Sequence, residues 1–217
     1  MHTNWSEYLP IFVLGFSSLF PLINPIGTAM IIEPYFKGID NSQRRHYALR
    51  IVMYAFFMGA VTVHVGSAVL SFMGVSIPAT QTAGGIVIAL LGYGLLSRAD
   101  VDKSDDSEKA SLERSVFYPI SFPLTLGPGG ISTLIALSAH LRHDGPGFFS
   151  PKLAVLTAAL FTVLLLAYLC FVYNDKISSR MGTTGNQVLN RLMAFLVFCI
   201  GIQMAFNGVM GLIKASG

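Results

Sequence analysis

Residues 20–28 read FPLINPIGT, and residues 122–133 read FPLTLGPGGIST. Each stretch lies inside a long segment without Asp, Glu, Lys or Arg, namely residues 8–32 and 115–141. Proline removes a backbone hydrogen bond from a helix, and glycine weakens a helix through its conformational freedom. The chain therefore interrupts two of its most apolar segments in nearly the same way, about half its length apart.

The composition indicates that lipid is the solvent of this protein. The chain has 217 residues, of which 53% are hydrophobic and 12% are charged, and its mean hydropathy is +0.63. Soluble domains usually carry about 25% charged residues. A charged fraction half that size favours a multi-pass membrane protein.

The uncharged segments predict six transmembrane helices. A bilayer core about 30 Å thick needs roughly 20 helical residues. Four uncharged segments fit one crossing each, but the segment 51–97 would form a helix of about 70 Å. It also contains the turn-like GVSIPATQ, so we divide it into two spans. The expected spans are 8–32, 51–73, 79–97, 116–139, 153–173 and 192–213.

The distribution of basic residues predicts the orientation. Loops on the side of the N-terminus hold Arg142, Lys152 and Lys214, whereas the opposite side holds the other eleven Lys and Arg residues. Cytoplasmic loops carry the excess of positive charge. Both termini are therefore expected to face outward.

The repeated motif predicts an inverted repeat. Phe-Pro-Leu followed by Pro-x-Gly occurs in spans one and four, and three spans are an odd number, so the second copy must be inserted upside down. We expect an all-α, 3+3 architecture, as in several secondary transporters. The first repeat is 1–97, a cytoplasmic linker is 98–115, and the inverted repeat is 116–217. The acidic cluster of the linker is compatible with cation binding, but a solvated loop is the favoured interpretation.

The two interruptions also predict how the helices restart. Asparagine is a preferred N-cap and proline is favoured at the first helical position, so Asn24-Pro25 and Gly127-Pro128 each favour a new helix. One half-helix would run inward and the other outward from the middle of the membrane, with both positive dipole ends at the interior. Free amides of Ile26, Gly27, Gly129 and Gly130 would then converge on a carboxylate or another small anion. The alternative is that both are kinked structural helices that pack closely through glycine.

Polar residues elsewhere in the spans extend the candidate site. Gln203 and Asn207 lie one turn apart in span six, where they either line the substrate path or tie helices together. The full set of expected substrate-binding residues is Asn24, Pro25, Gly27, Thr28, Gly127, Pro128, Gly129, Gly130, Ser132, Thr133, Gln203 and Asn207.

Three further side chains within the spans have competing interpretations. His64 near the centre of span two is a candidate for carrying a coupling proton, although a histidine hydrogen-bonded to a neighbouring helix is the commoner case. The two cysteines, Cys170 and Cys199, are expected to be packing residues.

Several function classes are disfavoured. All eleven carboxylates lie outside the six expected spans, so we expect neither a metal nor a cation site within the membrane. The sequence lacks H-E-x-x-H, G-x-S-x-G and a nucleotide-binding P-loop. It also lacks a basic amphipathic surface for nucleic acid. We therefore expect no enzyme activity, no cofactor and no nucleic-acid partner.

Four stretches resemble the MarC family of bacterial inner-membrane proteins. They are PLINPIG (21–27), AGGIVIALLGYGLL (83–96), FPLTLGPGGIST (122–133) and NRLMAFLVFCIGIQMAFNGV (190–209). The resemblance covers essentially the whole chain. It implies kinship with six-span exporters of the LysE type, a place in the bacterial inner membrane, and transport of small neutral amino acids such as glycine and alanine. In that membrane the outward-facing termini expected from the basic residues would be periplasmic. His64 is not a feature that the resemblance explains.

These observations predict a secondary transporter that works by alternating access around a site in the middle of the membrane. Its expected partners are a small-molecule substrate and the lipid bilayer, and a homo-oligomer is left open. The alternatives are an efflux protein or channel for other small metabolites or anions, and a membrane scaffold that transports nothing.

Overall fold

The structure, a computed structural model, describes residues 5–97, 108–142 and 150–216, and every regular element within these ranges is helical. The elements are α1 (Trp5–Ile23), α2 (Pro25–Phe36), α3 (Asn41–Val61), η1 (Thr62–Gly66), α4 (Ser67–Phe72), α5 (Ile77–Ser97), α6 (Glu108–Ser115), η2 (Val116–Thr125), α7 (Pro128–Arg142) and α8 (Pro151–Ser216). The segments η1 and η2 are wide helical turns of the π type. The all-helical expectation is confirmed for the described residues.

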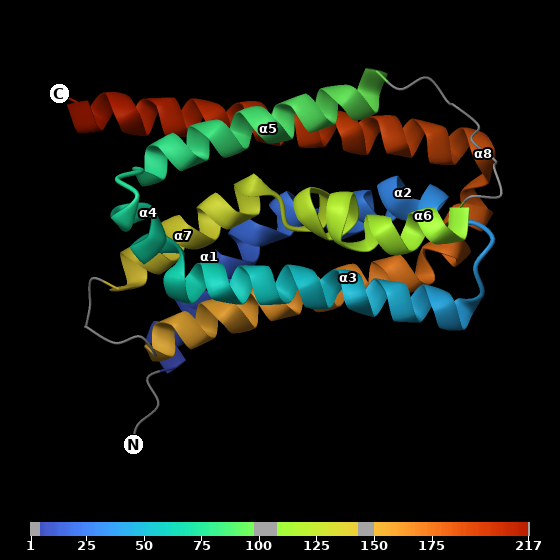
Figure 1. Cartoon of the computed structure of the whole chain (residues 1–217), viewed down its shortest axis with the longest axis horizontal. Coiled ribbons are helices and arrows are strands. Elements are labelled where there is room, and N and C mark those ends of the chain that lie inside the picture. The colour runs from blue at the N-terminus through green and yellow to red at the C-terminus, as the bar shows by residue number, and fades with distance from the viewer. Residues whose placement is uncertain (1–4, 98–107, 143–149, 217) are drawn as a thin grey trace.

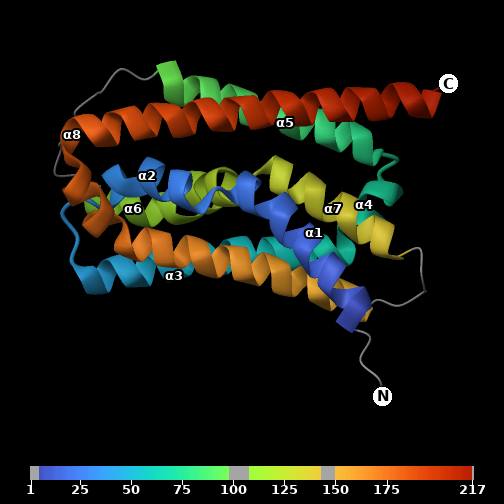
Figure 2. The same cartoon turned by 180° about the vertical axis from the view of Figure 1, so that it is seen from behind.

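The long helix α8 doubles back at one end of the molecule (Figures 1 and 2). Its N-terminal part runs beside α3, and its C-terminal part returns beside α5. Helix α1 begins and helix α8 finishes at the same end of the molecule (Figure 1). At that end, the Lys152 ammonium lies 2.8 Å from the Glu7 carboxylate and joins the start of α8 to the start of α1.

The C-terminal part of α8 packs against α5 at backbone distance. A Cβ atom added to Gly85 would lie 2.2 Å from the Ala205 nitrogen, and one added to Gly201 would lie 2.3 Å from the Ala89 nitrogen. Any side chain at either position would collide with the main chain of the facing helix. Small residues at such contacts are typical of helix pairs in membranes, where van der Waals packing replaces the hydrophobic effect.

Four helical segments of the described part are long and apolar enough to cross a bilayer: Glu7–Phe36, Asn41–Phe72, Pro151–Asn174 and Ala194–Ala215. A bent pair, Leu112–Thr125 with Pro128–Leu141, supplies a fifth if it counts as one span. These five correspond to five of the six expected spans. The remaining one, 79–97, coincides with α5, a helix of 21 residues. The count of six and the inverted repeat stay predictions.

The first half of the expected linker, 98–107, lies outside the described residues. Its second half is helical: α6 leads directly into η2, so the fourth span starts earlier than position 116. The main buried cluster unites α1, α2, α3, η2, α7 and the N-terminal part of α8, with Leu19, Ile51, Ile120 and Leu160 each 0% exposed. This cluster holds both interrupted helices against one another.

Candidate functional site

The first interruption is a single residue, Asn24, between α1 and α2. Asn24 has φ 45° and ψ 66°, a left-handed conformation that asparagine tolerates better than most residues. Its side-chain oxygen accepts a hydrogen bond from the Gly27 amide at 3.2 Å, and Pro25 follows at the first helical position. The predicted restart of a helix at Asn24-Pro25 is confirmed.

This cap changes the hydrogen bonding of the preceding turn. In an unbroken helix the Ile23 carbonyl would accept from the Gly27 amide, which here binds Asn24 instead. The Thr28 hydroxyl takes its place and donates to the Ile23 carbonyl at 2.7 Å. A side-chain hydroxyl thus satisfies a carbonyl that would be costly to leave unpaired in hydrocarbon.

The second interruption is longer than the motif predicted. Tyr118 and Phe122 have extended backbone angles inside η2 because each precedes a proline. Hydroxyls again satisfy displaced carbonyls: Thr125 donates to the Ile120 carbonyl at 2.8 Å, and Ser121 donates to the Val116 carbonyl at 2.6 Å. The two interruptions therefore share a chemical device, a hydroxyl that donates to the carbonyl five residues earlier.

Helix α7 restarts where the sequence predicted. It begins at Pro128, and the Gly127 carbonyl accepts from the Ile131 amide at 3.0 Å, as an N-cap carbonyl does. The bend between 112–125 and 128–141 is 57°. The second segment is therefore broken rather than kinked.

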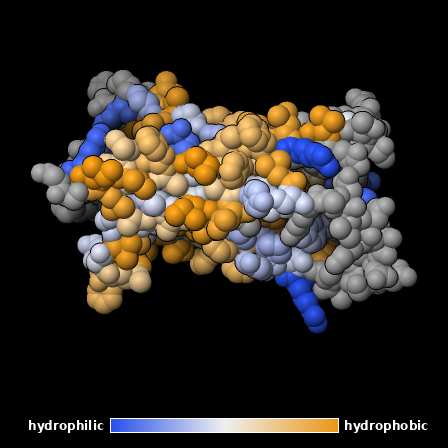
Figure 3. All heavy atoms as spheres, turned by 90° about the horizontal axis from the view of Figure 1, so that it is seen from above, coloured by the Kyte–Doolittle hydropathy of each residue, from blue (hydrophilic) through white to orange (hydrophobic). Residues whose placement is uncertain are grey.

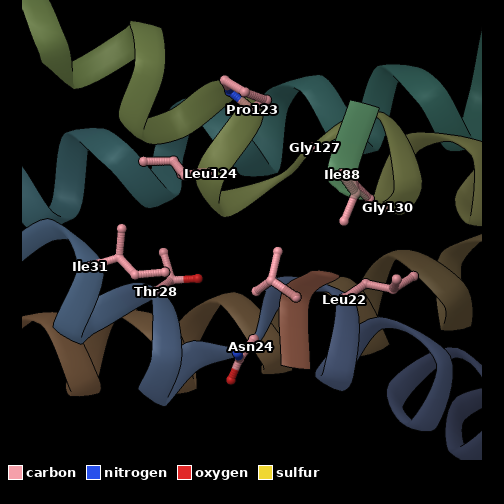
Figure 4. A pocket seen from close by; sticks show the side chains of 10 residues that line it. Leu22, Asn24, Thr28, Ile31, Ile88, Pro123, Leu124, Gly127 and Gly130 are labelled. Atoms are coloured by element: carbon pink, nitrogen blue, oxygen red, sulfur yellow. The ribbon is translucent and has the colours of Figure 1, made fainter. Parts of the chain in front are cut away.

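A cavity of about 30 Å³ lies between the two restarts. Leu22, Asn24, Thr28 and Ile31 come from the α1–α2 side, and Pro123, Leu124, Gly127 and Gly130 come from the η2–α7 side (Figure 4). Ile88 of α5 and Val197 of α8 complete the lining. The N-termini of α2 and α7 thus border one shared cavity, and none of the described side chains that line it is charged.

Four of the twelve predicted site residues line this cavity: Asn24, Thr28, Gly127 and Gly130. Pro25, Pro128 and Thr133 do not line it. Gly27 is buried and its amide binds Asn24, so the prediction of a free amide there is wrong. Gly129 is buried against Ile88 and Met204.

Ser132 also lies outside the cavity lining. It is 0% exposed, and its hydroxyl bonds to the carbonyls of Pro128 at 2.6 Å and Thr80 at 3.1 Å. This hydroxyl joins α7 to α5.

Gln203 and Asn207 lie away from the cavity. Both are exposed on the C-terminal part of α8, where the Gln203 amide nitrogen donates to the Asn207 amide oxygen at 2.9 Å. Cys170 packs against the main core, but Cys199 is exposed, so the expectation of packing is wrong for Cys199.

The six lining residues that the sequence did not predict are all apolar: Leu22, Ile31, Ile88, Pro123, Leu124 and Val197. Pro123 belongs to the repeated Phe-Pro-Leu motif, so the repeat could have predicted its place at the cavity. Ile88 and Val197 lie on α5 and α8, and only tertiary packing brings them to the interruptions.

His64 lies in the wide turn η1 and is half-buried. Its Nδ1 atom is 2.9 Å from the Ala60 carbonyl, one turn earlier in the same span. Because a carbonyl only accepts, Nδ1 carries the proton in this bond. This bond lies within the same span, and the expected bond to a neighbouring helix stays a prediction.

A buried polar cluster lies at the far end of α2 from the cavity. Arg44 is 2% exposed, and its guanidinium binds the Glu33 carboxylate. The Asn174 amide donates to Glu33 at 2.6 Å and to the Ala29 carbonyl at 3.0 Å. The sequence analysis placed Glu33 and Arg44 in loops; both instead lie within helices, and Arg44 is fully buried.

Helices of membrane-spanning length and a cavity between two helix restarts define a multi-pass integral membrane protein. The chain belongs to the MarC family of integral membrane proteins, because residues 9–213 match the profile of that family. It is 30% identical over 211 residues to the inner membrane protein MarC of Citrobacter koseri, and 28% identical over 212 residues to that of Salmonella paratyphi A. Each alignment covers 93% of this chain and 95% of the relative.

These relatives and the apolar helices place the chain in the inner membrane as a multi-pass protein. No solved structure matches the chain.

Proposed function

We propose that this protein is a secondary transporter of small neutral amino acids, of the glycine and alanine class, that works by alternating access. The observation that carries the proposal is the cavity between the starts of α2 and α7. Broken helices whose N-termini meet near mid-membrane form the substrate sites of several transporter folds. The resemblance to exporters of the LysE type and the expected inverted repeat agree with this proposal.

The charge distribution around the cavity suits a zwitterion. Helix N-termini carry a partial positive charge that favours a carboxylate. Backbone carbonyls at the interruptions and the Asn24 side chain would accept hydrogen bonds from the ammonium group. With no charged side chain in the lining, substrates that bear a net charge would be poorly compensated.

The size of the cavity favours small substrates and a closed state. A cavity of about 30 Å³ has room for about two or three water molecules, which is less than an amino acid needs. Glycine at positions 127 and 130 keeps side-chain bulk out of the site, whereas leucine, isoleucine and valine supply half of its lining residues. Substrate entry therefore requires the two half-helices to separate, as alternating access demands.

The orientation completes the proposal. Eleven of the fourteen Lys and Arg residues lie on the side that we assign to the cytoplasm, so both termini would be periplasmic. Helix α2 would then run from the cavity toward the cytoplasm and α7 toward the periplasm. Each side of the membrane would thus have one half-helix able to move.

Counterflow in liposomes tests the proposal. Purified protein in vesicles preloaded with unlabelled alanine should take up labelled alanine or glycine transiently and saturably. A panel with charged amino acids and small carboxylates such as lactate identifies other classes of substrate. Uptake of lactate alone would replace the amino acid assignment with that of a small-anion carrier. No uptake of any member by correctly inserted protein would favour a membrane scaffold.

A further inference from the structure

The C-terminal part of α8 exposes two amides near the centre of a candidate span. Gln203 and Asn207 lie near the middle of Ala194–Ala215, and both side chains are exposed. Their mutual bond of 2.9 Å uses one N–H and one acceptor lone pair. Each amide group offers two N–H donors and two lone pairs, and neither side chain has another hydrogen bond in the described part of the structure. Lipid tails cannot satisfy the N–H donors and lone pairs that the mutual bond leaves unused.

The exposed face around these amides has the spacing of a helix–helix seam. Side chains alternate by four and three residues along it, which is the pattern of left-handed helix pairs in soluble and membrane proteins. All of them are exposed: Leu192, Leu196, Cys199, Gln203, Phe206 and Met210. We call this set the α8 seam.

The α8 seam is the face of the helix that α5 leaves uncovered. The positions that contact α5, among them Gly201, Ala205 and Gly208, lie on the opposite side of the helix. Seen from the side of α5 and the C-terminal part of α8, the middle of the molecule is mostly hydrophobic (Figure 3). Apart from the Gln203 amide, the seam presents only apolar side chains and one thiol.

We propose that two copies of this chain pair through the α8 seam to form a homodimer. An amide both donates and accepts, so it is complementary to the same amide of a second copy. Interhelical amide bonds of this kind hold transmembrane helices together. The absence of charge from the seam favours a partner with the same apolar surface and argues against a charged one.

The geometry of insertion fixes how the two copies meet. All copies enter the membrane in one orientation, so the two-fold axis lies along the membrane normal. The two seams then run parallel and in register. Gln203 faces Gln203 of the second copy, and Cys199, one turn away, faces the same thiol of that copy. In this arrangement a single polar position in an apolar seam fixes the register.

Cys199 makes the proposal directly testable, because the chain has only one other cysteine, Cys170. Membranes that contain the full chain are oxidised with copper phenanthroline and resolved without reductant. We expect a disulfide-linked dimer from the parent and from the Cys170→Ala variant, and none from Cys199→Ala. A control carries Leu90→Cys on a background without Cys170 and Cys199. Leu90 is 65% exposed on α5, away from the seam, and this control should stay monomeric.

The amides are tested by substitution and by counting subunits. Gln203→Leu with Asn207→Leu should weaken the dimer roughly 3- to 30-fold, as expected for lost interhelical hydrogen bonds. Gln203→Asn keeps an amide at this position, so this variant should retain the dimer. Photobleaching of labelled protein at low density in liposomes should show mostly two-step traces for the parent.

One-step traces at every density, or equal cross-linking by the Leu90→Cys control, would overturn the proposal. These readouts are independent of transport, so they hold or fail separately from the proposed function.

Discussion

Both oxygens of the Glu33 carboxylate lie 2.6 Å from the same guanidinium nitrogen of Arg44, and this ion pair joins α2 to α3 inside the protein. Asn174 of α8 donates to the same carboxylate, so three elements meet at one buried acid. Glu33 lies in the half-helix whose other end borders the cavity. The cluster thus fixes the end of α2 that lies farther from the cavity. Helix α2 must move if the cavity is to open toward the cytoplasm.

Replacing Glu33 with glutamine should strongly destabilise the protein. The change leaves the buried Arg44 charge without its carboxylate, and breaking a buried pair in this way typically costs about 3–5 kcal/mol. A clear drop in the melting temperature of the detergent-solubilised protein is expected. Arg50→Gln is the matched control, because Arg50 pairs at 3.4 Å with the exposed Glu113, and such pairs contribute about 0–1 kcal/mol. Equal shifts in the two variants would contradict this assignment.

The left-handed backbone at Asn24 predicts an unusual order of substitutions. Asn24→Ala loses the cap and puts at φ 45° a residue that tolerates the left-handed region less well than asparagine, with an expected loss of about 1–2 kcal/mol. Asn24→Gly loses the cap but accepts the backbone angle without strain, so it should be the milder change. Thermal melting of both variants provides the comparison. If alanine is tolerated as well as glycine, the left-handed geometry is not what asparagine is needed for.

Transport should be abolished by Gly130→Leu while membrane insertion is retained. A Cβ atom at Gly130 would lie 2.7 Å from a methyl carbon of Leu126, and a larger side chain would fill the cavity that Gly130 borders. Gly94→Leu is the control, since a Cβ there meets nothing within 4 Å. Labelled alanine counterflow is measured for both variants at matched protein content. Activity that survives in Gly130→Leu would remove α7 from the site.

The interruptions were predictable because their causes are local. Asparagine at a left-handed position, proline at the first helical position and the extended residue before a proline all follow from chemistry within a few residues. Asn24, Gly127 and Pro128 were placed correctly for this reason. The extent of the second interruption was underestimated, because Tyr118 and Phe122 leave helical geometry well before Gly127.

The residues that were misplaced depend on packing between distant segments. Ile88 and Val197 reach the cavity only because α5 and the returning part of α8 pack across it. Arg44 was assigned to water on the strength of its charge, yet a carboxylate eleven positions earlier allows its burial. Gln203 and Asn207 were correctly placed on one face, but the sequence does not tell which face α5 covers.

His64 offers a last test, of energy coupling. Its Nδ1 atom lies 2.9 Å from the Ala60 carbonyl in η1, and a histidine side chain is the type of group that can carry a coupling proton near neutral pH. A coupling role predicts that alanine uptake driven by a pH gradient varies between pH 5 and 8 in the parent and loses this dependence in His64→Ala. Counterflow, which needs no gradient, should survive the substitution. Identical pH profiles for the parent and His64→Ala would leave His64 with a structural role only.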